Sequence, residues 1–175
     1  VDVIHDEVFY GSTALKNVVL PNCEFSLGEH VFYECSGIET VTFQDKTVIK
    51  ELSGSLFAGS ALKEFVVSKD NTNYKAEGNF LLNKAGDTIV LYAVGSVDEE
   101  ITIDEKYKHI GPSAFSGSSI KQLTILNSDT TIGDGAFQYC ENLETVILPS
   151  EGNIVVGNNA FANTTAISTI KNMSS

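Results

Sequence analysis

Three cysteines and three histidines are the side chains of this sequence best suited to bind a metal ion or to act in nucleophilic catalysis. Cys23, Cys35 and Cys140 share no spacing typical of a zinc site. A catalytic or metal-bound histidine needs an oriented partner, and no serine, aspartate or second histidine recurs at a fixed distance from any of the three. We therefore predict no catalytic residue and no metal site, and we expect surface positions for His5, His30 and His109.

Oxygen-bearing side chains between residues 70 and 77 raise the question of a calcium loop. Asp70, Asn71, Asn73 and Glu77 lack the D-x-[DN]-x-[DN]-G spacing, and no bidentate glutamate follows at the right distance. An ordinary polar turn is the better interpretation. The sequence predicts no cofactor.

The composition excludes whole classes of partner. The 175 residues include 11 basic residues, all of them lysine, against 23 acidic ones, and the net charge is −12. Binding to nucleic acid or to an anionic membrane depends on clustered cations, so we expect neither. No apolar run approaches the roughly 20 residues that span a bilayer, and we expect no insertion into a membrane.

A repeat of 22 to 25 residues determines the fold. Six of the ten phenylalanines lie in register, at positions 9, 32, 57, 115, 137 and 161. An aliphatic residue stands five positions before each of them: Ile4, Leu27, Leu52, Ile110, Ile132 and Val156. An L-x-x-L-x-L pattern begins five or six positions after each phenylalanine, for example at Leu143.

This last pattern alternates with a period of two, which indicates a short strand with one buried face. The strand has no partner within its own coil, so strands of successive coils must pair in parallel about 4.8 Å apart. The phenylalanines then stack in the core, and the small residues after them form a short helical or 3-10 turn. The sequence predicts a solenoid with one parallel strand per coil of 22 to 25 residues.

One step between repeat phenylalanines is 58 residues long, from Phe57 to Phe115. Its extra residues contain the apolar segments 80–82 and 89–92, which flank the glycine-containing sequence NKAGD and indicate an inserted β-hairpin. We predict a single domain over residues 1–175, with three repeats in 1–67, a hairpin island in 68–103 and three repeats in 104–175.

Two cysteines occupy one position of the repeat, three residues after the phenylalanine. Cys35 and Cys140 stand where other coils have Ser or Thr, and at least three coils separate them, which corresponds to more than about 14 Å. They cannot form a disulfide with each other, and we expect them to be packing residues. Cys23 lies 12 residues from Cys35, so a bridge within one coil stays open as an alternative.

One outward side chain per predicted strand offers a candidate binding surface. These residues are Val19, Thr42, Val66, Thr124 and Ile147, which would line up as a β-branched stripe on one sheet face. Charged residues flank the stripe, among them Lys63, Glu64, Lys121 and Glu144. The stripe could stabilise an exposed sheet through cross-strand contacts, or it could bind protein, as extended solenoid faces do. Because the chain has no Trp and no Arg, we expect any affinity to be modest.

The repeat resembles the BspA-like leucine-rich-repeat family of bacterial and protozoan surface proteins. The segment Ile132–Pro149, IGDGAFQYCENLETVILP, is similar throughout to the family motif I-G-x-x-A-F-x-x-C-x-x-L-x-x-V-x-L-P. The segment IGPSAFSGSSIKQLTI is similar as well, whereas ELSGSLF in the third repeat departs from the motif. An island pattern of the family is matched at Asn71, Tyr74, Gly78, Leu81 and Tyr92. The resemblance implies a leucine-rich-repeat solenoid without catalytic residues.

The resemblance also implies export and adhesion. The chain is therefore predicted to be a non-enzymatic module, extracellular or at a bacterial cell surface, which binds an extracellular or host protein through the exposed sheet face. A structural spacer in a larger surface protein is the alternative. A carbohydrate-active β-helix enzyme is a more remote one, because the outward rows hold only the scattered carboxylates Glu39, Glu64 and Glu144. Neither end shows a polar cap, so we also expect either a longer protein or end-to-end self-association.

Overall fold

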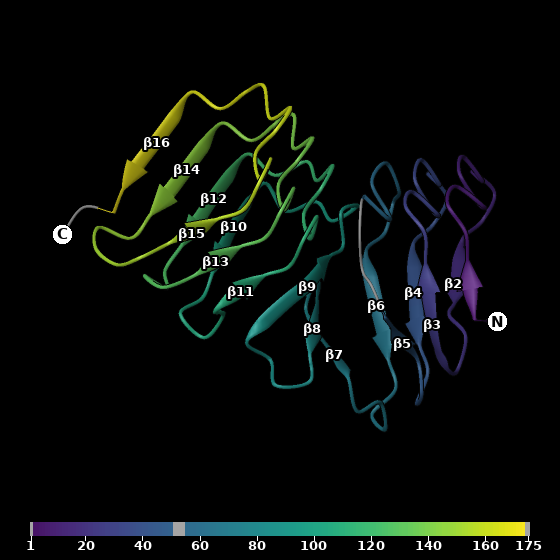
Figure 1. The fold of residues 1–175 in the computed structure, drawn as a ribbon. Coiled ribbons are helices and arrows are strands. Elements are labelled where there is room, and N and C mark those ends of the chain that lie inside the picture. The colour runs from purple at the N-terminus through teal and green to yellow at the C-terminus, as the bar shows by residue number, and fades with distance from the viewer. Residues whose placement is uncertain (1, 51–54, 174–175) are drawn as a thin grey trace.

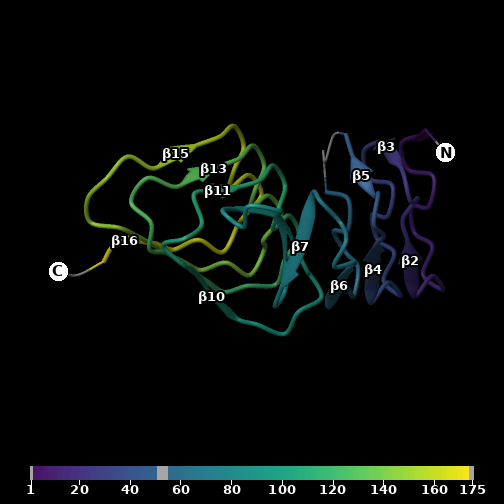
Figure 2. The same cartoon turned by 90° about the horizontal axis from the view of Figure 1, so that it is seen from below.

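The chain folds into two stacks of coils that follow one another along the molecule (Figure 1). The computed structural model describes residues 2–50 and 55–173; Leu52, one of the aliphatic repeat positions, lies outside them. We call residues 2–68 the first stack, 69–87 the insert and 88–173 the second stack. The two ends of the chain lie at opposite ends of the array in both ribbon views (Figures 1 and 2).

Each coil contributes a strand to a parallel ladder, as the sequence predicts. In the first stack these strands are β2 (Asn17–Val19), β4 (Thr40–Phe43) and β6 (Glu64–Val67). In the second stack they are β10 (Glu100–Ile103), β12 (Gln122–Ile125), β14 (Thr145–Leu148) and β16 (Thr169–Asn172). The inward residues Val41 and Leu123 are fully buried, so the alternation in the sequence becomes a buried and an outward face.

The structure adds a second strand to each coil, where the sequence predicts only one, and five of these seven strands have only two residues. The added strands are β1 (Val3–Ile4), β3 (Glu24–Leu27) and β5 (Val48–Ile49) in the first stack, and β9 (Thr88–Tyr92), β11 (His109–Ile110), β13 (Thr131–Ile132) and β15 (Val155–Val156) in the second. A strand of two residues is too short to show an alternating pattern. Gly133, which follows β13, lets neighbouring coils stack closely, because a Cβ on this residue would lie 2.7 Å from the backbone nitrogen of Pro112.

The third side of each coil is a run of hydrogen-bonded turns. The short helical or 3-10 turn expected from the sequence is not formed there, since the described residues contain no helix of either kind. The Phe137 amide donates across to Ala160 in the next coil at 2.7 Å, so the turns also form a ladder. A left-handed residue stands two positions after the repeat phenylalanine and prevents the turn from continuing as a helix: Gly11, Glu34, Gly59, Gly117, Tyr139 and Asn163. We call this side the turn edge; it comprises residues 10–14, 33–37, 58–61, 116–119, 138–142 and 162–166.

Stacked aromatic rings run through the core of both stacks. In the first stack, Phe32 lies between Phe9 and Phe57, with ring centroids 5.4 and 5.3 Å apart. In the second, Tyr92, Phe115, Phe137 and Phe161 follow one another at 4.8, 4.8 and 5.2 Å. Tyr92 thus takes the place of a repeat phenylalanine. Because β9 pairs with β11 and β10 with β12, residues 88–103 form a coil of the second stack in the region that the sequence analysis assigns to the island.

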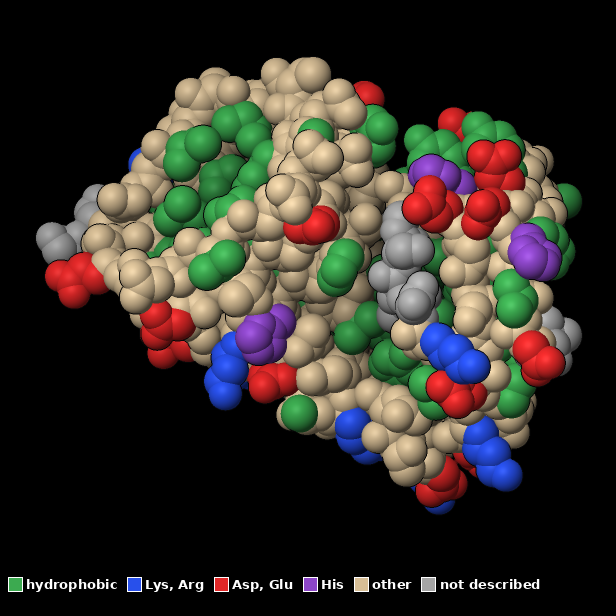
Figure 3. All heavy atoms as spheres, viewed as in Figure 1, with side chains coloured by type: hydrophobic (Ala, Val, Ile, Leu, Met, Phe, Trp, Pro, Cys, Tyr) green, Lys and Arg blue, Asp and Glu red, His purple; other side chains and the backbone are tan. Residues whose placement is uncertain are grey.

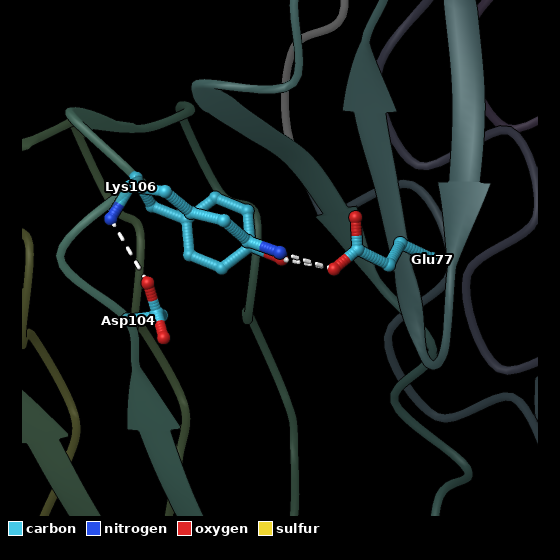
Figure 4. A network of polar contacts seen from close by, with 4 residues as sticks. Glu77, Asp104 and Lys106 are labelled. Atoms are coloured by element: carbon cyan, nitrogen blue, oxygen red, sulfur yellow. Dashed lines mark hydrogen bonds and ion pairs between the residues drawn. The ribbon is translucent and has the colours of Figure 1, made fainter.

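The insert forms the hairpin that the sequence predicts and one strand more. β8 (Phe80–Asn83) pairs antiparallel with β9, and the turn between them is held by the Asn83 Oδ1, which accepts the Gly86 amide at 2.8 Å. The additional strand β7 (Tyr74–Glu77) pairs with the other edge of β8. On β7, Glu77 forms an ion pair with Lys106, whose ammonium also lies 4.9 Å from the centre of the Tyr107 ring (Figure 4). The Lys106 ammonium, as a hydrogen-bond donor, lowers the pKa of Glu77, and the pair ties the insert to the second stack.

The polar turn predicted for residues 70 to 77 is present up to residue 73, after which Tyr74–Glu77 form a strand, and the centre of the turn is a buried asparagine. The Asn71 Nδ2 donates to the Gln44 and Thr47 carbonyls at 2.7 and 3.1 Å. Its Oδ1 accepts the backbone amides of Asn73 and Tyr74, each at 2.8 Å. Asn71 is therefore a structural residue that fixes where the chain leaves the first stack.

The two stacks contact each other directly beside the insert. The hydroxyls of Ser55 and Ser116 form a buried hydrogen bond of 2.7 Å, and the Gly95 amide donates to the Leu62 carbonyl at 2.8 Å. A Cβ on Gly117 would lie 2.8 Å from the Cβ of Ala58, so the backbones approach closely here. The insert therefore loops out between two coils that touch.

Candidate functional site

The predicted stripe is present in the first stack as a row of three outward side chains. Val19, Thr42 and Val66 are cross-strand neighbours on β2, β4 and β6. Val19 and Val66 are 64% and 41% exposed. The parallel ladder holds all three at fixed spacing, so the row is a rigid apolar strip open to solvent.

A second row occupies the corresponding face of the second stack. Thr124 and Ile147 are neighbours on β12 and β14, and the row continues to Thr102 on β10 and Lys171 on β16. The strands of this sheet form no ladder with β6. The single stripe expected from the sequence is thus two separate rows, because the insert follows β6 and the strands of the two stacks run in different directions (Figure 1).

Charges of alternating sign flank both rows. In the first stack, Lys63 lies 3.5 Å from Glu39 of the preceding coil. In the second, Lys121 lies 2.7 Å from Glu99, and this hydrogen bond raises the pKa of Lys121, to which nearby Glu144 adds. These exposed pairs contribute little to stability, but they cancel one another's charge. Glu64 stands apart, exposed on β6 beside Thr40.

The cysteines are packing residues, as expected for the repeat position. The Cys35 thiol donates to the Phe9 carbonyl at 2.9 Å, and the Cys140 thiol donates to the Phe115 carbonyl at 3.1 Å. Both are buried free thiols, so the Cys23–Cys35 bridge left open by the sequence is not formed. Burial raises the pKa of both thiols, that of Cys140 to about 11, which disfavours the reactive thiolate.

The histidines lie at or near the surface. His109 Nδ1 is 2.6 Å from the Thr131 hydroxyl, and His30 meets the edge of the Tyr33 ring at 5.1 Å. Within the described ranges, no three histidine, cysteine or acidic side chains are close enough to hold a metal ion. Residues 2–50 and 55–173 also contain no helix that could cross a membrane.

Exposed aromatic rings on the turn edge are the feature that the sequence analysis missed. Tyr10 and Tyr139 are 49% and 38% exposed, and the ring of Tyr10 stacks on that of Tyr33 at 5.7 Å. Tyr10 and Tyr33 each follow a repeat phenylalanine directly, and Tyr139 stands one position later. The recurrence of tyrosine at these positions was the available signal in the sequence, although it does not tell which rings lie near each other across the two stacks.

Comparison with known proteins agrees with this architecture. The chain matches the model of the BspA type leucine-rich-repeat region, with six copies over residues 2–93 and 94–175. It is similar to the crystal structure of a leucine-rich repeat protein from Eubacterium ventriosum, with 28% identity, a TM-score of 0.80 and coverage of 99% of this chain and 46% of that one. The fold is also that of the pneumococcal vaccine antigen PcpA, at 17% identity and a TM-score of 0.58, with 98% of this chain and 54% of that chain covered.

The chain thus spans about half the length of these two structures. A comparison with curated proteins found no match. The family model covers nearly the whole chain, and the stacked coils, the parallel ladders and the phenylalanine core are what its repeat requires. The chain belongs to the BspA type leucine-rich-repeat family.

Proposed function

We propose that this chain is a non-enzymatic binding module that recognises an extracellular or host protein through the outward faces of its two ladders. The observation that carries the proposal is the row of Val19, Thr42 and Val66, in which two large apolar side chains are exposed on either side of a threonine on a rigid sheet. Exposed apolar side chains in a contiguous row favour contact with another protein.

The charges beside the rows support the same function. Lys63 and Lys121 are each paired with a glutamate of a neighbouring coil, so a partner would meet the β-branched rows without first having to remove unpaired charges. No Trp and no Arg stand on these faces, and the affinity of a single module is therefore modest. Display at a bacterial surface or secretion agrees with the family and with the similarity to a pneumococcal antigen.

The distribution of carboxylates favours binding over hydrolysis. Glycoside hydrolysis needs two carboxyl groups that converge on one bond. Glu39 is paired with Lys63, Glu144 lies in the second stack, and Glu64 stands in a different row from both. The alternative of a structural spacer requires no binding row, and the experiment below distinguishes it.

A binding test can separate these functions. The protein would be assayed by surface plasmon resonance against a panel of purified extracellular-matrix proteins. Replacing both Val19 and Val66 with lysine should weaken binding to any partner at least tenfold, because two buried valines contribute on the order of 3 kcal/mol. Val155→Lys is the matched control. Val155 is 59% exposed on β15, which lies outside the two ladders that carry the rows.

Equal binding by the double variant and the parent would refute the assignment of this face. The spacer function is favoured instead if no member of the panel binds and a spacer of equal length restores the adhesion that is lost when the segment is deleted from a longer protein that contains it.

A further inference from the structure

A groove lies where the turn edges of the two stacks meet. It has a volume of about 240 Å³ and is lined by Tyr33, Ala58 and Gly59 of the first stack and by Gly117, Ser118, Ser119, Tyr139, Glu141 and Asn142 of the second. The space-filling view shows a notch between the two stacks at the top of the molecule (Figure 3). The groove exists only because the insert loops out and leaves these two turn edges in contact.

The groove has aromatic walls and a floor of small residues. Tyr33 stands on one side, held by its stack with Tyr10 and by a T-shaped contact with His30. Tyr139 stands on the other side and is 38% exposed. On the floor, Ala58 and Gly117 pack so closely that no larger side chain would fit between them. The space between the tyrosines is therefore left open.

The charge in and around the groove is negative. Glu141 lines the groove on the second stack. Glu34 lies beside it, next to Gly59, and is oriented by the Tyr10 hydroxyl at 3.1 Å. Burial raises the pKa of Tyr33, and the charges of Glu34, Tyr139 and Glu141 add to the rise, which agrees with all four groups lying near one another. No lysine is among the described residues that line the groove.

Two residues at or beside the groove have a backbone conformation that their residue types seldom adopt. Glu34 and Tyr139 are left-handed, with φ of 56° and 60°. Four other coils have Gly or Asn at the same position, where left-handed geometry is easily adopted. Of the two residues that depart from that preference, Tyr139 brings an aromatic ring to the groove and Glu34 lies beside it.

We propose that this groove binds an arginine side chain from an exposed segment of a partner protein. A guanidinium ion is planar, so it can lie against a tyrosine face and at the same time donate hydrogen bonds to a carboxylate. Tyr33 and Tyr139 supply the faces and Glu141 supplies a carboxylate in the groove, while Glu34, whose carboxylate accepts the Tyr10 hydroxyl, adds negative charge from beside it. The groove is a second contact surface, distinct from the outward rows of the ladders.

The test is a titration of ¹⁵N-labelled protein with three short peptides that are identical except for a central arginine, lysine or citrulline. Citrulline keeps the shape of arginine without its charge. We expect the amide signals of Gly59, Gly117 and Ser118 to shift with the arginine peptide, several-fold more weakly with lysine, and not with citrulline. Tyr139→Ala and the double variant Glu34→Gln/Glu141→Gln should each weaken binding about five- to tenfold.

Matched controls separate this site from general attraction to an acidic protein. Tyr139→Phe retains the ring and should bind as the parent does. Glu105→Gln removes an exposed carboxylate outside the groove and should also leave binding unchanged. Equal shifts with the citrulline peptide, unchanged binding by Tyr139→Ala, or an equal loss in Glu105→Gln would each overturn the proposal. Unchanged thermal unfolding of the variants shows that a loss of binding is not a loss of fold.

Discussion

The tyrosine at the start of the second aromatic stack offers the sharpest test of the packing. Tyr92 is 2% exposed, and its buried hydroxyl lies near the Ser96 and Asp98 side chains without making a well-formed hydrogen bond to any of the described residues. The ring stacks on Phe115 as a repeat phenylalanine does. Replacing Tyr92 with phenylalanine keeps the ring contacts and removes a polar group whose desolvation costs about 1–3 kcal/mol. Allowing for the lost contacts of one oxygen atom, we expect Tyr92→Phe to stabilise the protein by about 1 kcal/mol at pH 7.

The same substitution should have a larger effect at high pH. Burial raises the pKa of Tyr92 from 10.0 to about 12, with a smaller contribution from Asp98. Because the folded pKa is raised, the contribution of Tyr92 to stability is fully present below pH 10 and is lost as the pH rises toward 12. At pH 11 the loss is about 1.4 kcal/mol. The stability difference between Tyr92→Phe and the parent should therefore grow from about 1 to about 2.4 kcal/mol between pH 7 and pH 11.

Urea unfolding followed by circular dichroism, with a reductant present, measures this difference at each pH. Groups other than Tyr92 titrate alike in the two proteins, so their effects cancel. Tyr74→Phe is the control, because the Tyr74 hydroxyl donates to the Ile49 carbonyl at 3.3 Å, and its loss should destabilise the protein by about 1 kcal/mol. A destabilised Tyr92→Phe at pH 7, or a difference that does not change with pH, would show that the hydroxyl has a partner or contacts water.

Three other perturbations address the remaining features. Asn71→Ala should lower the free energy of unfolding by about 2–4 kcal/mol, measured by urea unfolding, because four hydrogen bonds of a buried side chain are lost; a loss below 1 kcal/mol would contradict its structural role. Cys35 and Cys140 should react with a thiol reagent only after unfolding, and fast labelling of either in the native protein would contradict their burial. We also propose that copies associate end to end through the apolar hollows of about 370 and 250 Å³ at the first and last coils; Ile170→Lys should then abolish concentration-dependent sedimentation, and a monomer at all concentrations would refute it.

The sequence predicted the repeat because each coil uses the same residue types at the same spacing. Its long strands follow from local patterns that packing does not change, whereas the buried position of Asn71 depends on the Gln44 carbonyl, 27 positions earlier in the chain. It could not predict the strands of two residues, whose existence depends on how closely neighbouring coils stack. Tyr92 was assigned to the island because it lies in the extra residues after Phe57 and matches the island pattern of the family, and only the coordinates place its ring on Phe115.

The candidate surfaces were likewise predicted only in part from the sequence. The rows of outward side chains were readable from the period of two, because a parallel ladder puts equivalent residues side by side. The separation of the rows into two sheets could not be predicted from the sequence, since it depends on the path of the insert. The groove between Tyr33 and Tyr139 was hidden for the same reason: residues more than a hundred positions apart meet there only after the two stacks have packed together.

The ladders also determine how the molecule responds to mechanical load. Their hydrogen bonds join one coil to the next and therefore point along the axis of each stack. A force between the two ends of the chain, which lie at opposite ends of the array, pulls on these bonds one coil at a time and does not shear whole strands past one another. Where the Ser55–Ser116 contact opens, the insert adds slack chain between the stacks. The array should thus extend in small successive steps at low force, as a compliant element rather than a stiff rod.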